Sequence, residues 1–347
     1  MAYTDPMKRV LAFTRTYWLY LLLGAVLFAL GVGLGWYLSA QTKAAPYRSV
    51  REISSEYKFI SPFLYLEVPE STQPQMVSLK KEFQQAVDQA LASGNATDVS
   101  IYFRDMNTGR WTAINRTHTF ALASMLKVVT LMTVLHAAEA HPDTLSSHIT
   151  ISPQLAQKAV PQAYFPPAHP IAIGVSQSLE EVFWHQIVES DNTAENALES
   201  YIGLDAIKET YKDLGLPLAP DTTTDADTAQ EYSHIFRVLY NSTYLSRANS
   251  QAVLDLLSRT TFDAGLVAGV PPGTTVAHKF GENLVPEGTA SSSPVISELH
   301  DCGIVYYPDH PYFMCVTTKG SDFPTLANVI KDISAIAWKG AQAINPE

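Results

Sequence analysis

The stretch from Ser124 to Leu135 constrains the fold of this chain most strongly. It begins with Ser124, Met125, Leu126 and Lys127 and continues along a helix that is apolar on almost every side. Such a helix belongs in a buried core. Ser124 and Lys127 share one helical face because they stand three residues apart, which places their Cβ atoms roughly 5–6 Å from each other. The sequence therefore predicts a lysine amine within reach of a serine hydroxyl inside a folded domain.

The same spacing of serine and lysine occurs twice more, from Ser55 to Lys58 and from Ser78 to Lys81. Ser78 and Lys81 open a charged, glutamine-rich amphipathic stretch, in which the lysine stays solvated and protonated. A protonated lysine cannot take a proton from a nucleophile. We therefore assign the motif to Ser124.

Two further three-residue motifs follow in the chain. They are Ser190-Asp191-Asn192 and Lys279-Phe280-Gly281. The first lies in the connection between two predicted helices. The earlier helix starts at a capping box over residues 178–181, and the later one is capped by Asn192 with Glu195. The second lies at the end of a strand-like segment. Each motif alone is most often an ordinary helix cap, helix serine or strand residue, but the three in this order predict a catalytic site.

Together these side chains predict acyl transfer through a serine nucleophile. Ser124 needs an adjacent base, and Lys127 can be that base only when it is neutral. Burial lowers the pKa of a lysine, and a second cation nearby, Lys279, would lower it further. Ser190 would relay a proton to the leaving amine, and Asn192 would hydrogen-bond a substrate amide.

The developing oxyanion also needs hydrogen-bond donors. We expect them to be the backbone N–H groups of Ser124, at the helix start, and of Glu282, at the strand edge. Gly281 suits the close approach of a carbonyl group to the backbone because it has no side chain.

The first fifty residues differ from the rest. No charged residue occurs between Thr16 and Thr42, and the run from Tyr17 to Leu38 is almost entirely apolar, with aromatic residues near both ends. This pattern predicts a membrane-spanning helix over residues 17–39. A cleaved signal peptide is the alternative, but its apolar region is normally only about 7–15 residues long. Basic residues are balanced on the two sides of the run, so charge does not fix its orientation.

The chain after this run is acidic. Of the 23 Lys and Arg and the 34 Asp and Glu residues of the sequence, 18 and 33 lie from residue 51 onward, which is a net charge of −15. This balance argues against nucleic acid as a partner. No spacing of cysteine or histidine indicates a zinc site, and we expect no metal or other cofactor.

The only two cysteines, Cys302 and Cys315, flank a hairpin turn over residues 307–312. If Tyr307 pairs with Tyr312, the cysteines are diagonal neighbours on one face of the hairpin. That register favours two buried thiols over a disulfide.

The order of the elements predicts an α+β fold. A helix over residues 77–92 and strands at 99–103 and 111–114 precede Ser124, and strands at 274–280, 295–307 and 312–318 precede a last helix from Pro324. We expect the N- and C-terminal strands to share one antiparallel sheet, with a helical subdomain inserted between them. An apolar patch from Phe59 to Leu66 predicts that the linker, residues 40–75, packs in part on the domain at 76–347.

The motifs and their surroundings resemble the class A β-lactamases, within the superfamily of penicillin-recognising serine enzymes. The resemblance covers roughly residues 81–339 and includes the stretches 120–127, 190–198, 221–224 and 300–306. It implies that residues 76–347 lie outside the cytoplasmic membrane. With the predicted membrane helix, this makes residues 1–16 a cytoplasmic tail and the protein a single-pass membrane protein. The resemblance also implies that Ser124 is the acylated nucleophile and that Lys127 is its base or proton partner. Ser190 would be the proton shuttle, Asn192 a substrate contact and Lys279 an electrostatic anchor.

Two positions depart from the pattern of that family. Phe280 stands where the family has Thr or Ser, whose hydroxyl helps to hold the substrate carboxylate. The deacylating glutamate of the family lies in a long loop before the segment that begins at Asp221, and this loop is reduced here to residues 215–220, which include no carboxylate. No residue of that remnant can activate water against an acyl-serine. Glu282 is the alternative base that we identify.

Three functions fit these observations. The first, which we favour, is a membrane-anchored acyl-serine amidase that forms an acyl-enzyme on Ser124 with a β-lactam or with its expected physiological substrate, a D-Ala-D-Ala-type peptidoglycan stem peptide. The second is a β-lactamase that hydrolyses antibiotics with a different deacylating base. The third is a non-catalytic envelope protein that keeps the fold to bind peptidoglycan or a membrane partner. The sequence does not indicate an oligomeric state.

Overall fold

The computed structural model describes residues 17–18, 20, 22–33, 58–59, 70–216, 226–286 and 295–344. The chain divides into two units, Met1–Arg48 and Ser49–Glu347. In the first unit, Leu22–Gly33 is a short apolar helix. The predicted tail at residues 1–16 and residues 19, 21 and 34–39 of the predicted membrane helix lie outside the described residues, as does most of the linker.

One helical stretch in the described part of the chain is long and apolar enough to cross a membrane, and it is Ala123–Ala140. This stretch carries the motif of Ser124 and is mostly buried within the second unit. Val128, Leu131 and Met132 have no exposed surface. The stretch is therefore a core helix of the domain, as its apolar pattern predicts.

A five-stranded antiparallel sheet with the order β2-β1-β9-β8-β7 forms the centre of the second unit. β1 pairs with β9 along its whole length, so strands from the two ends of the domain meet in one sheet, as predicted. β7 is an edge strand of this sheet. The strands are β1 (Asp98–Asp105), β2 (Trp111–Ile114), β7 (Val276–Pro286), β8 (Val295–Val305) and β9 (Tyr312–Gly320).

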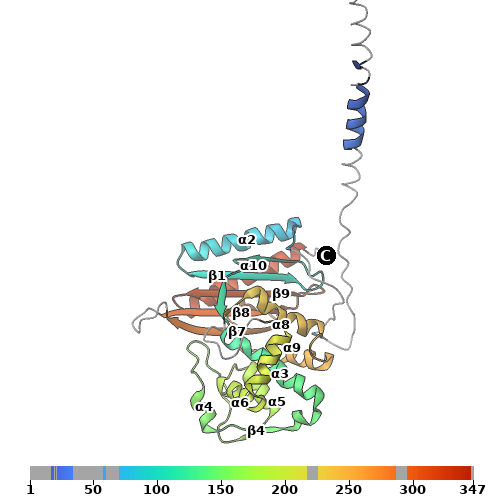
Figure 1. Ribbon diagram of the computed structural model, residues 1–347. Helices are drawn as coiled ribbons and strands as arrows, with labels where there is room; N and C mark the ends of the chain where they lie inside the picture. The colour runs from blue at the N-terminus through green and yellow to red at the C-terminus, as the bar shows by residue number, and fades with distance from the viewer. Residues whose placement is uncertain are drawn as a thin grey trace, which may run out of the picture. The chain divides into compact units, whose positions relative to one another are not determined.

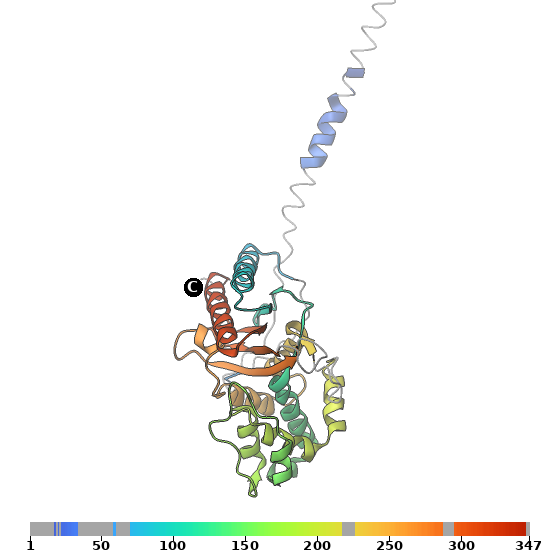
Figure 2. The ribbon, with the colours of Figure 1, turned by 90° about the vertical axis from the view of Figure 1, so that its left-hand side faces the viewer.

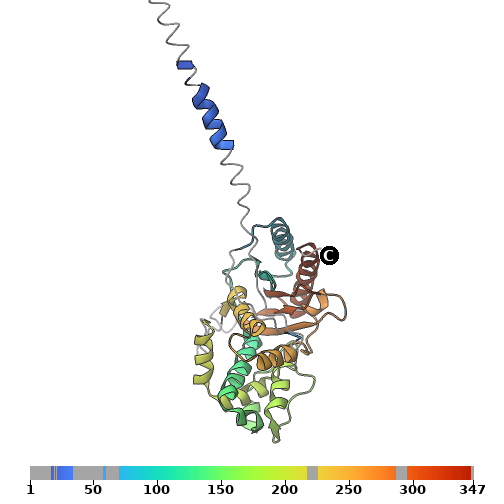
Figure 3. The same ribbon diagram turned by 90° about the vertical axis from the view of Figure 1, so that its right-hand side faces the viewer.

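Helices cover both faces of the sheet. α2 (Pro74–Ala92) and α10 (Phe323–Ile344) pack against each other on one face, whereas α8 (Ala229–Asn241) and α9 (Arg247–Leu257) contact the other (Figure 1). Views from the two sides show the sheet between these helical layers (Figures 2 and 3). Two hydrophobic cores result, one on each face of the sheet.

The helical subdomain follows β2 in the chain, and α3 lies at its centre in contact with α5, α6, α7 and α9. The predicted capping box at residues 178–181 starts α5. Two short antiparallel ladders, β3 with β6 and β4 with β5, complete the subdomain. Its elements are β3 (Thr119–Ala121), the 3-10 helix η1 (Ala123–Leu126), α3 (Lys127–Ala140), η2 (Pro142–Ser146), β4 (His148–Thr150), α4 (Pro153–Lys158), β5 (Ser176–Ser178), α5 (Leu179–Ile187), α6 (Asn192–Ile202), α7 (Leu204–Asp213), β6 (Ala226–Thr228) and, after α9, η3 (Val267–Gly269).

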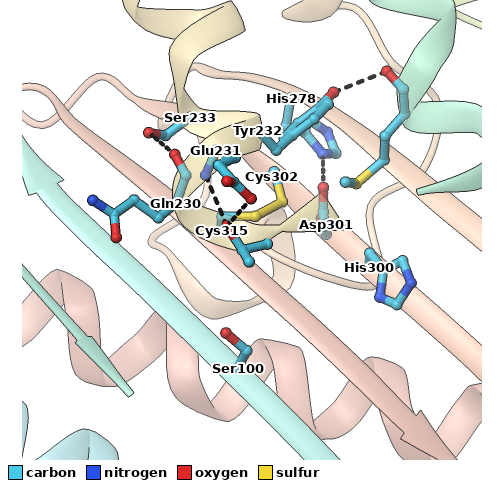
Figure 4. Close-up of a disulfide and its surroundings, with 12 residues drawn as sticks. Ser100, Gln230, Glu231, Tyr232, Ser233, His278, His300, Asp301, Cys302 and Cys315 are labelled. Atoms are coloured by element: carbon cyan, nitrogen blue, oxygen red, sulfur yellow. Dashed lines mark hydrogen bonds and ion pairs between the residues drawn. A yellow bond between two sulfur atoms is a disulfide. The ribbon is translucent and has the colours of Figure 1, made fainter. Parts of the chain in front are cut away.

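The prediction of two buried thiols is wrong, because Cys302 and Cys315 form a disulfide. The turn between β8 and β9 is longer than predicted, so Val305 rather than Tyr307 faces Tyr312 and the two cysteines stand directly opposite each other. Figure 4 shows the bridge beneath α8, near the hydrogen-bonded side chains of His278 and Asp301.

Phe59 of the predicted linker packs on the domain. Its backbone N–H donates to the side-chain oxygen of Gln251 at 2.7 Å, and its carbonyl accepts from the hydroxyl of Tyr306 at 2.9 Å. The rings of Phe59 and Tyr306 also meet edge to face. Residues 60–66, the rest of the predicted apolar patch, lie outside the described residues.

Candidate active site

Ser124 lies on a tight turn that is pressed against the edge strand β7. A Cβ atom added at Gly281 of β7 would stand 2.4 Å from the carbonyl oxygen of Leu122 and 3.0 Å from Cγ of Met125. Only glycine permits this approach. Ala123 adopts a φ of 49°, which is unusual for a residue with a side chain. The close approach that we predict at Gly281 is thus made by the chain's own backbone, and it brings Ser124 beside β7.

Two predicted site residues, Lys127 and Lys279, meet at a third, Ser190, in the connection between α5 and α6. Nζ of Lys279 donates to Oγ of Ser190 at 2.8 Å. Nζ of Lys127 donates to the same oxygen at 3.2 Å and also to the Ser190 carbonyl. Ser190 has a φ of 57°, a left-handed conformation at the turn between the two helices. We refer to Lys127, Ser190, Asn192 and Lys279 as the lysine cluster.

Asn192 joins this cluster through its side chain. Its Oδ1 accepts from Nζ of Lys127 at 2.6 Å, and its Nδ2 donates to the carbonyl of Val160 at 2.6 Å. The prediction that Asn192 caps α6 is wrong. The cap is Asp191, whose carboxylate accepts the backbone N–H groups of Thr193 and Ala194. Because Asp191 caps α6, the side-chain amide of Asn192 is available to hydrogen-bond Lys127.

Burial lowers the pKa of both lysines. Lys127 is 3% exposed and Lys279 has no exposed surface. Loss of hydration lowers the pKa of Lys127 to about 8, against the opposing charges of carboxylates, of which Glu195 is the strongest. The pKa of Lys279 lies well below its usual value, mainly because burial removes its hydration and secondly because Lys127 is a nearby positive charge. A lysine with a pKa near 8 has a neutral fraction at neutral pH and can act as a base.

Ser124 opens onto two cavities of about 180 and 360 Å³. Both are lined by Ser124, Val160, Asn192, Glu282 and Asn283, so they adjoin at the serine. Among the described residues, none hydrogen-bonds to the hydroxyl of Ser124. The predicted contact with Lys127 is therefore not formed here, and the Lys127 amine bonds to Ser190 and Asn192 instead. A larger hollow of about 580 Å³ near β2 contains none of the motif residues.

Glu282 lies in the wall of both cavities, but its carboxylate holds a neighbouring loop. Oε1 accepts the backbone N–H groups of Ala163 at 2.6 Å and Tyr164 at 2.9 Å, and Oε2 accepts that of Phe165 at 2.8 Å. These three donors occupy the side chain that the sequence offers as an alternative deacylating base.

Glu195 is a site residue that sequence reasoning treats only as a helix cap. It lines the larger cavity with Ser124, and its carboxylate accepts from the hydroxyl of Thr130 at 2.7 Å and from the amide of Gln186. The available signal is its position three residues after Asn192, because such residues share a helical face. Among the described residues, no group of His, Cys, Asp or Glu side chains could hold a metal ion.

A model of the β-lactamase enzyme family matches residues 79–341 of the sequence. This range covers most of the chain and includes all three motifs. The chain belongs to the β-lactamase enzyme family. It is accordingly a serine hydrolase of the penicillin-recognising superfamily. A comparison with curated proteins found no match.

Solved structures with the same fold include penicillin-recognising proteins and β-lactamases. PBP-A is 22% identical, with 79% of this chain and 98% of that chain covered and a TM-score of 0.62. A mutant of PBP-A, solved as an acyl-enzyme complex with penicillin G, is 21% identical over 78% and 98% of the two chains, with a TM-score of 0.62. A class A β-lactamase from Bacteroides cellulosilyticus is 21% identical over 76% and 99%, with a TM-score of 0.63. At these identities, the likeness establishes the fold.

Proposed function

We propose that this family member acylates Ser124 with the D-Ala-D-Ala-type stem peptide of peptidoglycan. The observation that carries the proposal is the buried amine of Lys127, whose pKa of about 8 provides a neutral base. Neutral Lys127 accepts the hydroxyl proton of Ser124 as the oxygen attacks the peptide carbonyl. Ser190, which is bonded to both lysines, passes a proton to the nitrogen of the leaving amine as the amide bond breaks.

The acyl-enzyme is expected to be long-lived with a β-lactam. The two described carboxylates that line the cavities at Ser124 are Glu195 and Glu282, and hydrogen bonds occupy both oxygens of each. The remnant of the deacylation loop, residues 215–220, contains no carboxylate. A penicillin is therefore proposed to inhibit this protein rather than to be consumed by it. The penicillin G complex of the PBP-A mutant is a precedent for an acyl-enzyme on this fold.

We further propose that the apolar run at residues 17–38 anchors the protein in the cell membrane, with the domain on the outer side. Its length and its lack of charge support this anchor. The Cys302–Cys315 disulfide supports an extracytoplasmic domain, because disulfides persist mainly in oxidising compartments.

The test uses acylated L-Lys-D-Ala-D-Ala peptides with free and amidated C-termini and the full chain in detergent, and it measures release of D-Ala from the first peptide and of D-alaninamide from the second. We expect release by the parent protein and by Ser78→Ala, which alters the exposed copy of the motif, but not by Ser124→Ala. Preincubation with a penicillin should block release. Equal release by Ser124→Ala would contradict the role of Ser124, and rapid turnover of penicillin would favour a β-lactamase instead.

A further inference from the structure

Five aromatic rings from four separate segments pack together beside Lys279. Phe262 stacks on Phe280 with ring centroids 4.3 Å apart, and Phe165 meets these two rings edge-on at 5.2 and 5.4 Å. Tyr164 stacks on Phe323 at 5.3 Å and meets Phe262 edge-on. We call Tyr164, Phe165, Phe262, Phe280 and Phe323 the aromatic wall.

The aromatic wall covers the amine of Lys279. The ring centroid of Phe280 lies 4.2 Å from Nζ of Lys279, and neither side chain has any exposed surface. Nζ donates to Oγ of Ser190 at 2.8 Å and to the carbonyl of Phe280 at 3.2 Å. Lys279 lines neither of the cavities at Ser124, so a substrate anion in them would not contact its amine. Phe280 also occupies the position at which the family's pattern has a hydroxyl.

Four side chains hold the loop that carries Tyr164 and Phe165. One of them, Glu189, accepts the backbone N–H groups of Ala168 and His169. The Glu282 carboxylate accepts three consecutive backbone N–H groups, those of residues 163–165. The Asn192 amide binds the carbonyl of Val160 at one end of the loop, and Oδ2 of Asp191 accepts the N–H of Ile171 at the other, at 2.8 Å. The wall is therefore held in part by Asp191 and Asn192, which belong to the motif of Ser190.

The charges of the open cleft do not favour an anion either. The described charged side chains that line the two cavities are Glu195, Glu282 and Lys158. Lys158 is exposed, so its charge is solvated and screened. A free carboxylate near the aromatic wall would lose its hydration without gaining a partner, which is costly.

We infer that the site takes acyl donors that are neutral on the leaving side, next to the aromatic wall, and discriminates against donors with a free carboxylate there. The substrate class is thus a peptide amide that continues as a chain or ends in an amide. Phe280 is the specificity-determining residue. This inference rests on the proposed acylation of Ser124 and narrows its substrate. A stem peptide that ends in the free carboxylate of D-Ala would be the poorer acyl donor, and one whose last residue is amidated or extended would be the better.

The test compares benzylpenicillin with its methyl ester as acylating agents of the full chain in detergent. The two differ only in the carboxylate, and intact-protein mass spectrometry gives the second-order rate constant of Ser124 acylation for each. Each constant is divided by the rate at which hydroxide opens the same β-lactam ring, which removes intrinsic reactivity. Phe280→Thr restores a hydroxyl at the wall, and the matched control Phe280→Leu removes the ring without adding one.

In the parent protein we expect the ester to react faster than the acid by about tenfold, the value of a charged hydrogen bond left unmade. Phe280→Thr should remove most of this preference, whereas Phe280→Leu should retain it. If the acid reacts as fast as the ester in the parent protein, the inference is overturned but the acylation of Ser124 stands. This comparison does not depend on the folding of any variant. Absence of any adduct with both compounds would instead overturn the proposed function, and the inference with it.

Discussion

The lysine cluster and the aromatic wall are neighbours, but the first is held by hydrogen bonds between buried polar groups and the second by apolar packing. Lys279 and Phe280 are consecutive residues of β7, yet the first bonds to Ser190 and the second stacks on Phe262. In the lysine cluster, buried polar groups are retained and paired by hydrogen bonds, as buried charges require. In the aromatic wall, apolar packing replaces a polar contact of the family's pattern. The chemistry of acylation and the recognition of the substrate can therefore change separately within one strand.

The largest effect is expected for Lys127→Met in the lysine cluster, a change that keeps the volume of the side chain but removes the proposed base. We expect acylation of Ser124 by benzylpenicillin methyl ester to fall about 10²–10⁴-fold, the usual contribution of a general base. The matched control is Lys158→Met, which alters an exposed lysine of the same cleft and should leave the rate nearly unchanged. A rate for Lys127→Met within a few-fold of the parent would rule out Lys127 as the base.

Gly281→Ala tests the contact between η1, which carries Ser124, and β7, which carries Lys279 and Phe280. The added Cβ would stand 2.4 Å from the Leu122 carbonyl, so η1 must move away from β7. We expect the free energy of unfolding to fall by about 1–3 kcal/mol, as in other overpacked sites, and acylation to slow as Ser124 shifts. Leu284→Ala, at an exposed position of the same strand, is the control in denaturant unfolding. Unchanged stability of Gly281→Ala would show that the backbones do not meet here.

Glu282→Gln tests what holds the aromatic wall. The neutral amide is a weaker acceptor for the backbone N–H groups of residues 163–165 than the carboxylate is. Hydrogen exchange of these amides should become about tenfold faster, the difference expected for hydrogen bonds to a charged group. Glu180→Gln, at an exposed position of α5, should leave the exchange unchanged. If both variants exchange like the parent, the carboxylate does not secure the loop.

The smallest effect concerns the pH dependence of acylation. The rate should rise with pH through about 8, because acylation needs the neutral form of Lys127. The carboxylate of Glu195 raises the pKa of Lys127, so Glu195→Gln should move this rise to lower pH and increase the rate at pH 7 by about threefold. Glu199→Gln, which removes a weaker contribution of the same sign, should shift the profile less. A shift to higher pH would refute the assignment of the profile to Lys127.

Much of the fold follows from periodicity alone. The apolar pattern of the stretch after Ser124 predicts a buried helix, and β2 has the bounds that its alternation predicts. The register of β8 and β9 could not be predicted in this way, because it depends on how many residues the turn at 306–311 uses. An error of two residues there separates Cys302 from Cys315 and hides the disulfide.

Some features of the candidate site could also be predicted from the sequence, and others could not. The convergence of Ser190 and the two lysines follows from motif order, because each motif is short and is held by regular elements. The packing of Phe280 against Phe262 does not follow, since Phe262 lies in an irregular segment before η3 and its direction is set by the tertiary fold. The choice of Asp191 rather than Asn192 as the cap of α6 was also out of reach, because both residue types are preferred there.

The most direct test of a competent acylation site without a deacylating base is the lifetime of the penicillin adduct. The full chain is incubated with excess benzylpenicillin, the free drug is removed, and intact-protein mass spectrometry follows the parent protein and Ser124→Ala. We predict an adduct on the parent protein alone that persists after the drug is removed. Penicillin that is rapidly consumed by the parent protein, with no adduct that survives drug removal, would contradict this account.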